Sequence, residues 1–189
     1  MQLRKKKNIK RDREAFLDGY KPALLIEKSN PDFHQLEGYP SYPYDEQNIF
    51  FFQNERGKQK FLQQFRTLEK DSYEECCLVG QTLGYPKKSV EFFARNCEIE
   101  KETGVYPNKE ITMNLFWAGF YFITNLFILT EEARWMWKTY THPKAIENPL
   151  YLLTKETSFL EIPYGDFHQL AKAREYIKKK RGLLVHIER

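Results

Sequence analysis

Apolar and aromatic residues are most concentrated in residues 115–140, a stretch that the rest of the chain must bury. Its first part, residues 115–127, lacks strict alternation of apolar and polar positions, so it is compatible with a buried helix or with two short strands. Aromatic and β-branched residues on both sides of Gly119 favour the strands. Thr130 and the two acids after it indicate the start of a helix over residues 131–140.

Shorter apolar runs elsewhere are typical of buried or half-buried strands. They lie at residues 23–26, 48–53, 150–153, 159–162 and 183–187. The proline-containing segment 29–45 predicts a loop, because a residue before proline is biased toward extended backbone. One helical turn is expected within it at residues 33–36, and Asp32 is placed to cap that turn.

Two helices are predicted in the segment that follows the second strand. A turn at residues 54–57 leads into the first helix, residues 58–68, whose apolar positions have helical spacing. Ser72 and Glu75 have the spacing of a capping box. In such a box the serine side chain accepts a hydrogen bond from the backbone amide of the glutamate, and the glutamate side chain accepts one from the backbone amide of the serine. The second helix is therefore expected to begin directly after Ser72.

Two further helices are predicted from their start and stop signals. One opens at Pro86, weakens through the charged residues 98–102 and stops by Gly104. The other covers residues 167–181, with Asp166 as its N-terminal cap and a cluster of cations at its C-terminal end.

These elements together predict an α+β protein. Helices are expected to pack on one small mixed or antiparallel sheet in a single compact domain over residues 14–189, preceded by a basic arm at residues 1–13. A chain of 189 residues that is 41% hydrophobic and 16% aromatic can bury a core of its own, which argues against disorder.

Positive charge is concentrated at the N-terminus of the chain. Residues 1–13 contain seven lysines and arginines and one acid, a formal charge of +6, so the remainder of a chain with a net charge of +4 has −2. The densest run consists of Arg4, Lys5, Lys6 and Lys7. A nucleic-acid-binding hypothesis therefore rests on this arm, with help from the basic residues 178–181 and from exposed tyrosines that stack on bases.

The three cysteines, at positions 76, 77 and 97, lack the spacing of a disulfide framework. Reduced thiols of this kind are typical of a cytoplasmic protein, and no apolar signal-peptide segment follows the charged N-terminus. Residues 115–129 are shorter than the roughly 20 residues of a membrane-spanning helix, so no membrane association is expected. Neither a cofactor nor a metal is expected, because phosphate-binding glycine loops and histidines at ligand spacing are missing from the sequence.

A repeated pentapeptide, DFHQL, supplies the first set of candidate catalytic residues. It begins at Asp32 and again at Asp166, and each copy fits the start of a helix capped by aspartate. The functional alternative places Asp32 and His34 opposite Asp166 and His168 in one cleft, as a general acid/base pair.

Cysteine supplies the second set of candidate catalytic residues. Cys77 and Cys97 lie in predicted helices that are close in sequence, and Lys87 and Lys88 between them are the kind of neighbour that lowers a thiol pKa. Buried, unreactive cysteine is the alternative interpretation.

Three hypotheses about function follow from these patterns. The leading one is a protein-interaction module without catalytic activity, because recognisable reactive motifs are missing from the sequence and stiff Tyr-Pro dipeptides are suited to a contact surface. Its candidate binding residues are Tyr39, Tyr42 and Tyr44, and its partner is another protein or a second copy of the chain. The second hypothesis is nucleic-acid binding through residues 1–13, and the third is an enzyme with a His/Asp or Cys/His site assembled from distant segments.

Overall fold

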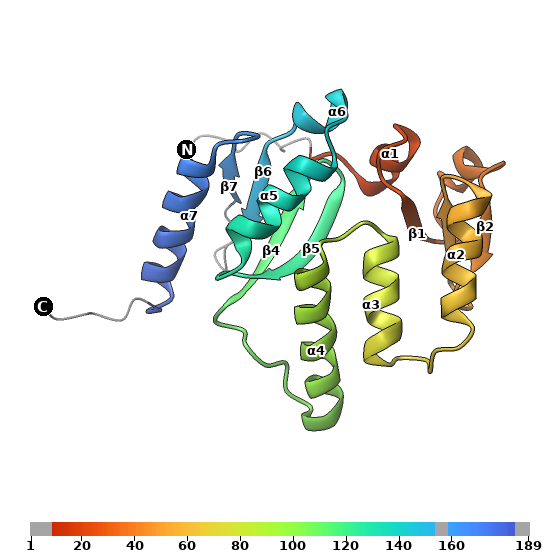
Figure 1. The fold of residues 1–189 in the computed structure, drawn as a ribbon, viewed down its shortest axis with the longest axis horizontal. Helices are drawn as coiled ribbons and strands as arrows, with labels where there is room; N and C mark the ends of the chain where they lie inside the picture. The colour runs from red at the N-terminus through yellow and green to blue at the C-terminus, as the bar shows by residue number, and fades with distance from the viewer. Residues whose placement is uncertain (1–8, 154–158, 184–189) are drawn as a thin grey trace, which may run out of the picture.

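The strands form two antiparallel sheets rather than the single sheet that we predicted from the sequence (Figure 1). The computed structural model describes residues 9–153 and 159–183. In the first sheet, β3 (Asn48–Phe52) lies between β1 (Ala23–Glu27) and β2 (Ser41–Pro43). Apolar patterning identified β1 and β3, but β2 lies within residues 29–45, which we predicted to be a loop; the extended backbone before Pro43 pairs with β3 instead. Such pairing depends on contacts between distant segments that patterning does not specify. The α+β class is confirmed.

The second sheet contains the strands from the apolar centre of the chain and from its C-terminal part. Its order is β5 (Phe120–Asn125), β4 (Thr112–Trp117), β6 (Leu150–Leu153) and β7 (Phe159–Ile162), all antiparallel. The preference for strands over a helix in residues 115–127 is thus confirmed. The strands at residues 150–153 and 159–162 have the predicted bounds.

Three helices connect the two sheets (Figure 1). They are α2 (Glu55–Phe65), α3 (Tyr73–Thr82) and α4 (Lys87–Thr103), and α3 packs along α4. The end of α4 at Gly104, which has a positive φ of 73°, is confirmed, but the helix does not weaken through residues 98–102. A left-handed residue after the last turn is the common helix terminator, and glycine adopts it without steric cost.

The predicted bounds of α2 are wrong at both ends. Residues 54–57 do not form a separate turn, because the Asn54 side chain accepts a hydrogen bond of 2.9 Å from the Gly57 amide and caps the helix. The helix then ends at Phe65 rather than at Leu68.

Helix α3 begins at the predicted residue, although only the serine half of the predicted capping box forms. The Ser72 hydroxyl oxygen accepts a hydrogen bond of 3.1 Å from the Glu75 amide, while the Glu75 carboxylate accepts one from the Asp71 amide. We expect Ser72→Ala to lower the free energy of unfolding by about 1 kcal/mol, because the Glu75 amide loses its acceptor. Urea denaturation checks this value, with Ser29→Ala as the control because that exposed serine caps no helix. Equal stability of the two variants would contradict the capping role.

The remaining helices are α1 (Asp12–Leu17), α5 (Leu129–Thr139), α6 (Pro143–Ile146) and α7 (Phe167–Lys180), with a 3₁₀ turn, η1 (Phe33–Leu36). Asp166 caps α7 as predicted, through a hydrogen bond of 2.8 Å from the Gln169 amide. Two predicted caps are wrong. Asp32 precedes η1, but within the turn its side chain accepts a hydrogen bond only from the Gln35 side chain and not from a backbone amide. Helix α5 starts after Ile128 rather than after Thr130. Of the predicted strand 183–187, residues 184–187 lie outside the described residues.

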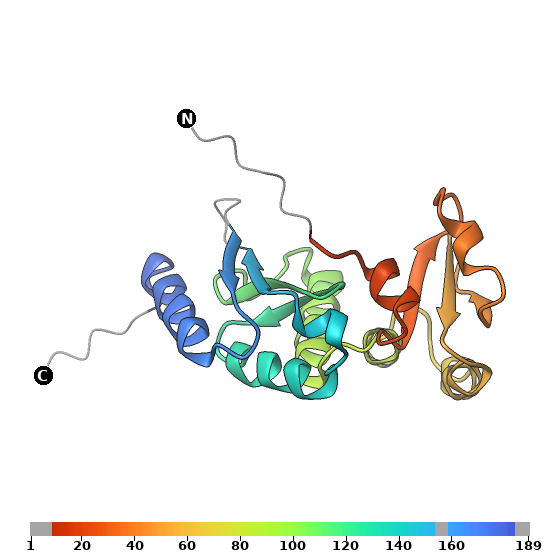
Figure 2. The same ribbon diagram turned by 90° about the horizontal axis from the view of Figure 1, so that it is seen from above.

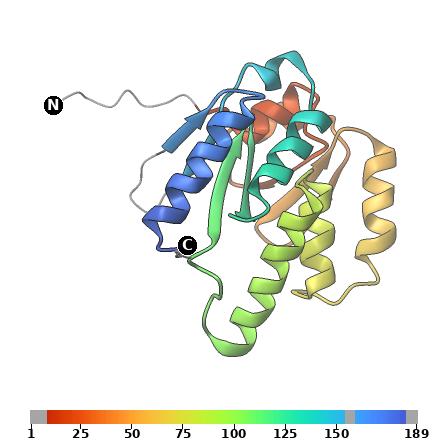
Figure 3. The same ribbon diagram turned by 60° about the vertical axis from the view of Figure 1, so that its left-hand side comes forward.

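Helices α5 and α7 cover one face of the second sheet, as Figure 3 shows. The core beneath them contains Met113, Leu115 and Trp117 from β4, packed with residues of α5 and α7 such as Met136 and Leu170. The first sheet has apolar residues on both faces, with α2 packed on one and α1 and η1 on the other. Among the described residues, no helix is both long enough and apolar enough to cross a membrane.

A buried polar contact links the N-terminal segment to the turn between β4 and β5. That turn consists of Ala118 and Gly119, both with positive φ, as a two-residue hairpin turn requires. Lys21 is fully buried, with its Nζ 3.4 Å from the Gly119 carbonyl oxygen and 4.5 Å from the centre of the Phe120 ring. A side chain on Gly119 would lie 2.5 Å from Cβ of Ala15, so α1 packs closely on this turn.

Candidate functional site

The two DFHQL segments do not come together. Asp32 and His34 lie at η1 beside the first sheet, where Asp32 forms an ion pair with Arg13 and His34 Nδ1 lies 3.1 Å from the Pro31 carbonyl oxygen. Asp166 caps α7, which packs on the second sheet, and His168 is exposed on that helix. Each aspartate thus has a local structural partner, and the structure assembles no shared cleft from these four residues.

The cysteines are held in the less reactive, protonated state. Burial raises the pKa of Cys77 and of Cys97, and it raises the pKa of Cys76 to about 12. The thiolate is the nucleophilic form, so a raised thiol pKa argues against nucleophilic catalysis at these positions.

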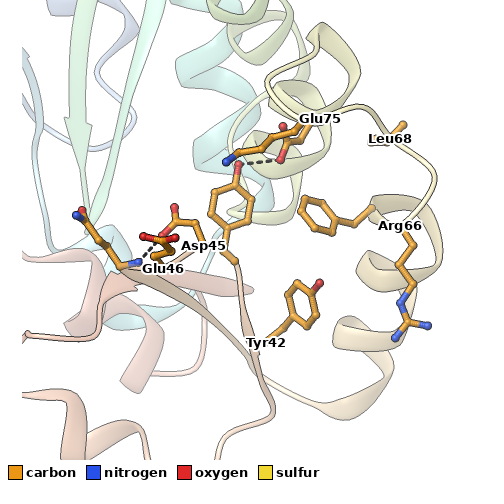
Figure 4. Close-up of a pocket in the computed structure, with 10 residues that line it drawn as sticks. Tyr42, Asp45, Glu46, Arg66, Leu68 and Glu75 are labelled. Carbon is orange, nitrogen blue, oxygen red and sulfur yellow. Dashed lines mark hydrogen bonds between the residues drawn. The ribbon is translucent and has the colours of Figure 1, made fainter.

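An open concavity with a volume of about 680 Å³ lies beside the edge strand β2 (Figure 4). We call it the β2 pocket. Three segments line it: the end of β2 and the turn after it, the end of α2 with the connection to α3, and the first turn of α3. The lining residues are Tyr42, Tyr44, Asp45, Glu46, Gln47, Phe65, Arg66, Leu68, Lys70 and Glu75.

Three half-buried aromatic rings form the apolar wall of the β2 pocket. The Phe65 ring contacts Tyr42 edge-on at 5.9 Å between centroids and Tyr44 at 5.7 Å. Tyr44 also contacts Phe50 of the buried core at 5.5 Å, so the wall is anchored to the first sheet. Rigid aromatic rings with exposed edges offer large contact area at a low cost in side-chain entropy.

Two of the acids in the pocket are already engaged by the protein. Glu75 is buried and accepts hydrogen bonds from the Tyr44 hydroxyl at 3.1 Å and from the Asp71 amide. Burial and the neighbouring Glu75 raise the pKa of Tyr44, so this hydroxyl remains a donor. Asp45 accepts hydrogen bonds from the side chain and amide of Asn48, which lower its pKa, with a further contribution from Lys70.

The cations of the β2 pocket are not engaged in the same way. Arg66 and Lys70 are exposed, and neither side chain forms an ion pair or hydrogen bond within the described part of the chain. Figure 4 shows Arg66 and Leu68 on one side of the pocket and Asp45 and Glu46 on the other. A ligand in this pocket therefore meets an aromatic wall flanked by a cationic side.

The structure brings together some of the predicted binding residues. Tyr42 and Tyr44 both line the β2 pocket, whereas Tyr39 packs on Phe16 at 4.8 Å between ring centroids, in the core on the other face of the first sheet. Arg4, Lys5, Lys6 and Lys7 lie outside the described residues. Sequence reasoning missed Phe65, Arg66, Lys70 and Glu75, which patterning assigned to a helix end, a connection and a cap.

Within residues 9–153 and 159–183, no cluster of three or more histidine, cysteine, aspartate or glutamate side chains is arranged to hold a metal ion. The β2 pocket is therefore characterised by its aromatic wall and by two cations, Arg66 and Lys70, that form no ion pair within the described residues. No protein-family model, curated protein or solved structure matches this chain.

Proposed function

We propose that this protein is a protein-interaction module that binds an acidic peptide segment in the β2 pocket and does not act as a catalyst there. The observation that carries the proposal is the pairing of an aromatic wall with unpaired cations, Arg66 and Lys70, in one open concavity. An apolar or aromatic side chain of the peptide packs against Tyr42 and Phe65, and a carboxylate of the peptide lies beside Arg66.

The chemistry of the lining residues supports binding rather than catalysis. A general base or nucleophile must be available to the substrate, but Asp45 and Glu75 accept hydrogen bonds from the protein itself. The third lining acid, Glu46, is exposed, and the ten lining residues include no serine, histidine or cysteine to act with it. Recognition of a carboxylate requires only the planar, permanently charged guanidinium that Arg66 presents.

Side chains, rather than backbone pairing with β2, account for the proposed binding. β2 is an edge strand, which is the usual position for an added peptide strand. However, Pro40 and Pro43 lack amide hydrogens and limit such pairing to very few residues. Specificity therefore resides in the aromatic wall and in the two cations.

Selection from a displayed library of random 12-residue peptides tests the proposal. We expect enrichment of peptides that combine an aromatic or large aliphatic residue with nearby aspartate or glutamate. Tyr42→Ala and Arg66→Glu should each weaken a selected peptide at least about tenfold, because aromatic and arginine contacts dominate such interfaces.

The matched control is Arg56→Glu, which makes the same charge change at an exposed position in the first turn of α2. Binding to this variant should remain within about twofold of the wild type. Failure to enrich any peptide, or selected peptides that bind the Tyr42 and Arg66 variants as tightly as the control, would refute the proposed function.

A further inference from the structure

Helix α7 carries a positive charge as large as the net charge of the whole chain. Its lysines and arginine, together with its single acid Glu175, give a formal charge of +4. The whole chain also has a net charge of +4, so the residues outside α7 sum to zero. Figure 2 shows α7 at the opposite end of the molecule from the first sheet, which lines the β2 pocket.

Two lysines of α7 lie on the side of the helix that faces away from the core. Leu170 and Ile177, seven residues apart, are buried against the second sheet. Lys172 and Lys179 each follow one of them by two positions, which is about 200° further around the helix. Both lysines are exposed, and neither forms an ion pair or hydrogen bond within the described residues.

Helix α5 extends this positive surface, because it runs beside α7 in the opposite direction (Figure 3). Arg174 of α7 donates to Thr130 Oγ1 near the start of α5 at 3.5 Å, while the Arg134 guanidinium lies 5.1 Å from the centre of the Phe167 ring at the start of α7. Arg134 and Lys138 are exposed, and neither is paired with an acid in the described part of the chain. We call the surface formed by Arg134, Lys138, Lys172 and Lys179 the cationic ridge.

The acids of α5 and α7 do not neutralise the cationic ridge. Glu175 pairs with Arg174 at 3.3 Å and with Lys178 at 2.9 Å, beside the ridge lysines. Glu131 pairs with Lys88 of α4 at 2.7 Å, and Glu132 is buried. The four ridge cations are therefore available to an external anion.

The exposed rings next to the cationic ridge are in contact with cations. The three pairs are Phe127 with Lys178 at 5.6 Å, Tyr176 with Lys180 at 5.8 Å and Phe167 with Arg134 at 5.1 Å. A cation against a ring occupies a position that a stacked base would take. The surface thus offers charge in place of open stacking platforms.

We propose that the cationic ridge binds double-stranded nucleic acid through its phosphates, independently of sequence. Lys172 and Lys179 are about 10.5 Å apart along the helix axis, and a duplex carries about six phosphates over that length. That number is enough for one phosphate at each ridge cation. A duplex also has twice the charge per unit length of one of its strands, so a surface that binds by charge alone favours it. This activity is separate from peptide binding in the β2 pocket.

The outermost positions of α7 favour a duplex over an anionic membrane or an acidic protein. These positions are His168, Lys172, Glu175 and Lys179, all of them exposed and polar. A membrane-binding helix places apolar side chains outermost, where they enter the lipid. The centre of a protein interface is depleted in charge, which also differs from this surface.

Fluorescence anisotropy at 50 mM salt with a labelled 16-base-pair DNA duplex, the RNA duplex of the same sequence and one DNA strand tests this proposal. We expect at least one duplex to bind more tightly than the single strand. The combined variant Lys172→Gln and Lys179→Gln should weaken duplex binding at least about tenfold and reduce the slope of log affinity against log salt by about 1.8, because two phosphate contacts are lost.

Two matched variants test whether the position and the charge of these lysines matter. Lys87→Gln combined with Lys101→Gln removes two exposed lysines of α4 and should leave the affinity within about twofold of the wild type. Lys172→Arg combined with Lys179→Arg keeps both charges and should retain binding.

Three results would overturn the proposal. They are no binding of either duplex at 50 mM salt, a single strand bound as tightly as both duplexes, and equal affinities for the two glutamine variants. Binding to vesicles of phosphatidylserine and phosphatidylcholine without binding to either duplex would assign the cationic ridge to a membrane and would overturn it as well.

Discussion

Replacing Lys21 with methionine should raise the free energy of unfolding at pH 7 by about 2 kcal/mol. Lys21 is fully buried, and burial lowers its pKa from 10.5 to about 8. A shift of that size corresponds to about 3 kcal/mol of destabilisation when the amine is charged. Methionine has a similar length without a charge, and it loses only the weak contacts of Lys21 with the Gly119 carbonyl oxygen and with the Tyr85 and Phe120 rings.

The pH dependence of this effect has a definite sign. The folded pKa of Lys21 lies below the unfolded one, so between about pH 8 and 10.5 the native state has lost the proton that the unfolded chain still binds, and the wild type gains stability as the pH rises through that window. The stability advantage of Lys21→Met should therefore be full below pH 8 and fall by about 3 kcal/mol across this window, so that above pH 10.5 the variant is about 1 kcal/mol less stable than the wild type. Ionisation of Tyr20 and Tyr85 affects both proteins alike and cancels in the difference. Urea denaturation of both proteins at pH 7 and pH 10.5 measures the difference in their free energies of unfolding. A methionine variant that is less stable than the wild type at pH 7 would contradict the prediction.

Removing the Glu132 carboxylate should lower the free energy of unfolding by about 3 kcal/mol. Glu132 is buried on α5 and accepts hydrogen bonds from the Ser89 amide at 3.0 Å and from the Ser89 hydroxyl at 2.5 Å. Ser89 lies in the first turn of α4, whose N-cap is Pro86 and has no side-chain acceptor. Glu132 therefore caps α4 from another helix. In Glu132→Ala the buried Ser89 amide loses its acceptor, and the Ser89 hydroxyl is left with Thr124 Oγ1, which lies 2.8 Å away.

The neighbouring residue provides the matched control for this prediction. Glu131 forms an exposed ion pair with Lys88, so Glu131→Ala should cost less than about 0.5 kcal/mol. Burial raises the pKa of Glu132 above 4.5 despite the hydrogen bonds from Ser89, so the native state favours the protonated carboxyl. The free energy of unfolding of the wild type should therefore exceed that of Glu132→Ala by a smaller margin as the pH rises from 4.5 through the folded pKa of Glu132. Equal costs for the two alanine variants in denaturant titrations would show that Glu132 does not cap α4.

Elements marked by local signals were predictable from the sequence. Ser72 and Asp166 form caps with their own helices, and the strands at residues 150–153 and 159–162 are short apolar runs with clear limits. The division into two sheets was not predictable, because strand pairing depends on where α2, α3 and α4 position segments that are distant in sequence. The cap of α4 was missed for the same reason, since Glu132 is 43 residues away from Ser89.

The candidate sites were predictable only in part. The Tyr-Pro dipeptides directed attention to Tyr42 and Tyr44, but their partners Phe65 and Arg66 come from the end of a helix whose predicted bounds were wrong. On the outer face of the second sheet, strand register brings Phe116 opposite both Tyr121 and Tyr151. The sequence shows that these residues are aromatic, but it does not show which of them share a surface.

Chemical-shift mapping of the 15N-labelled protein with a selected acidic peptide tests peptide binding in the β2 pocket most directly. The largest backbone amide shifts should cluster at residues 42–47, 65–70 and 75, and Arg66→Glu should abolish them at the same peptide concentration. Shifts concentrated in β4, β5 and β6, or shifts that persist in Arg66→Glu, would contradict binding in the β2 pocket.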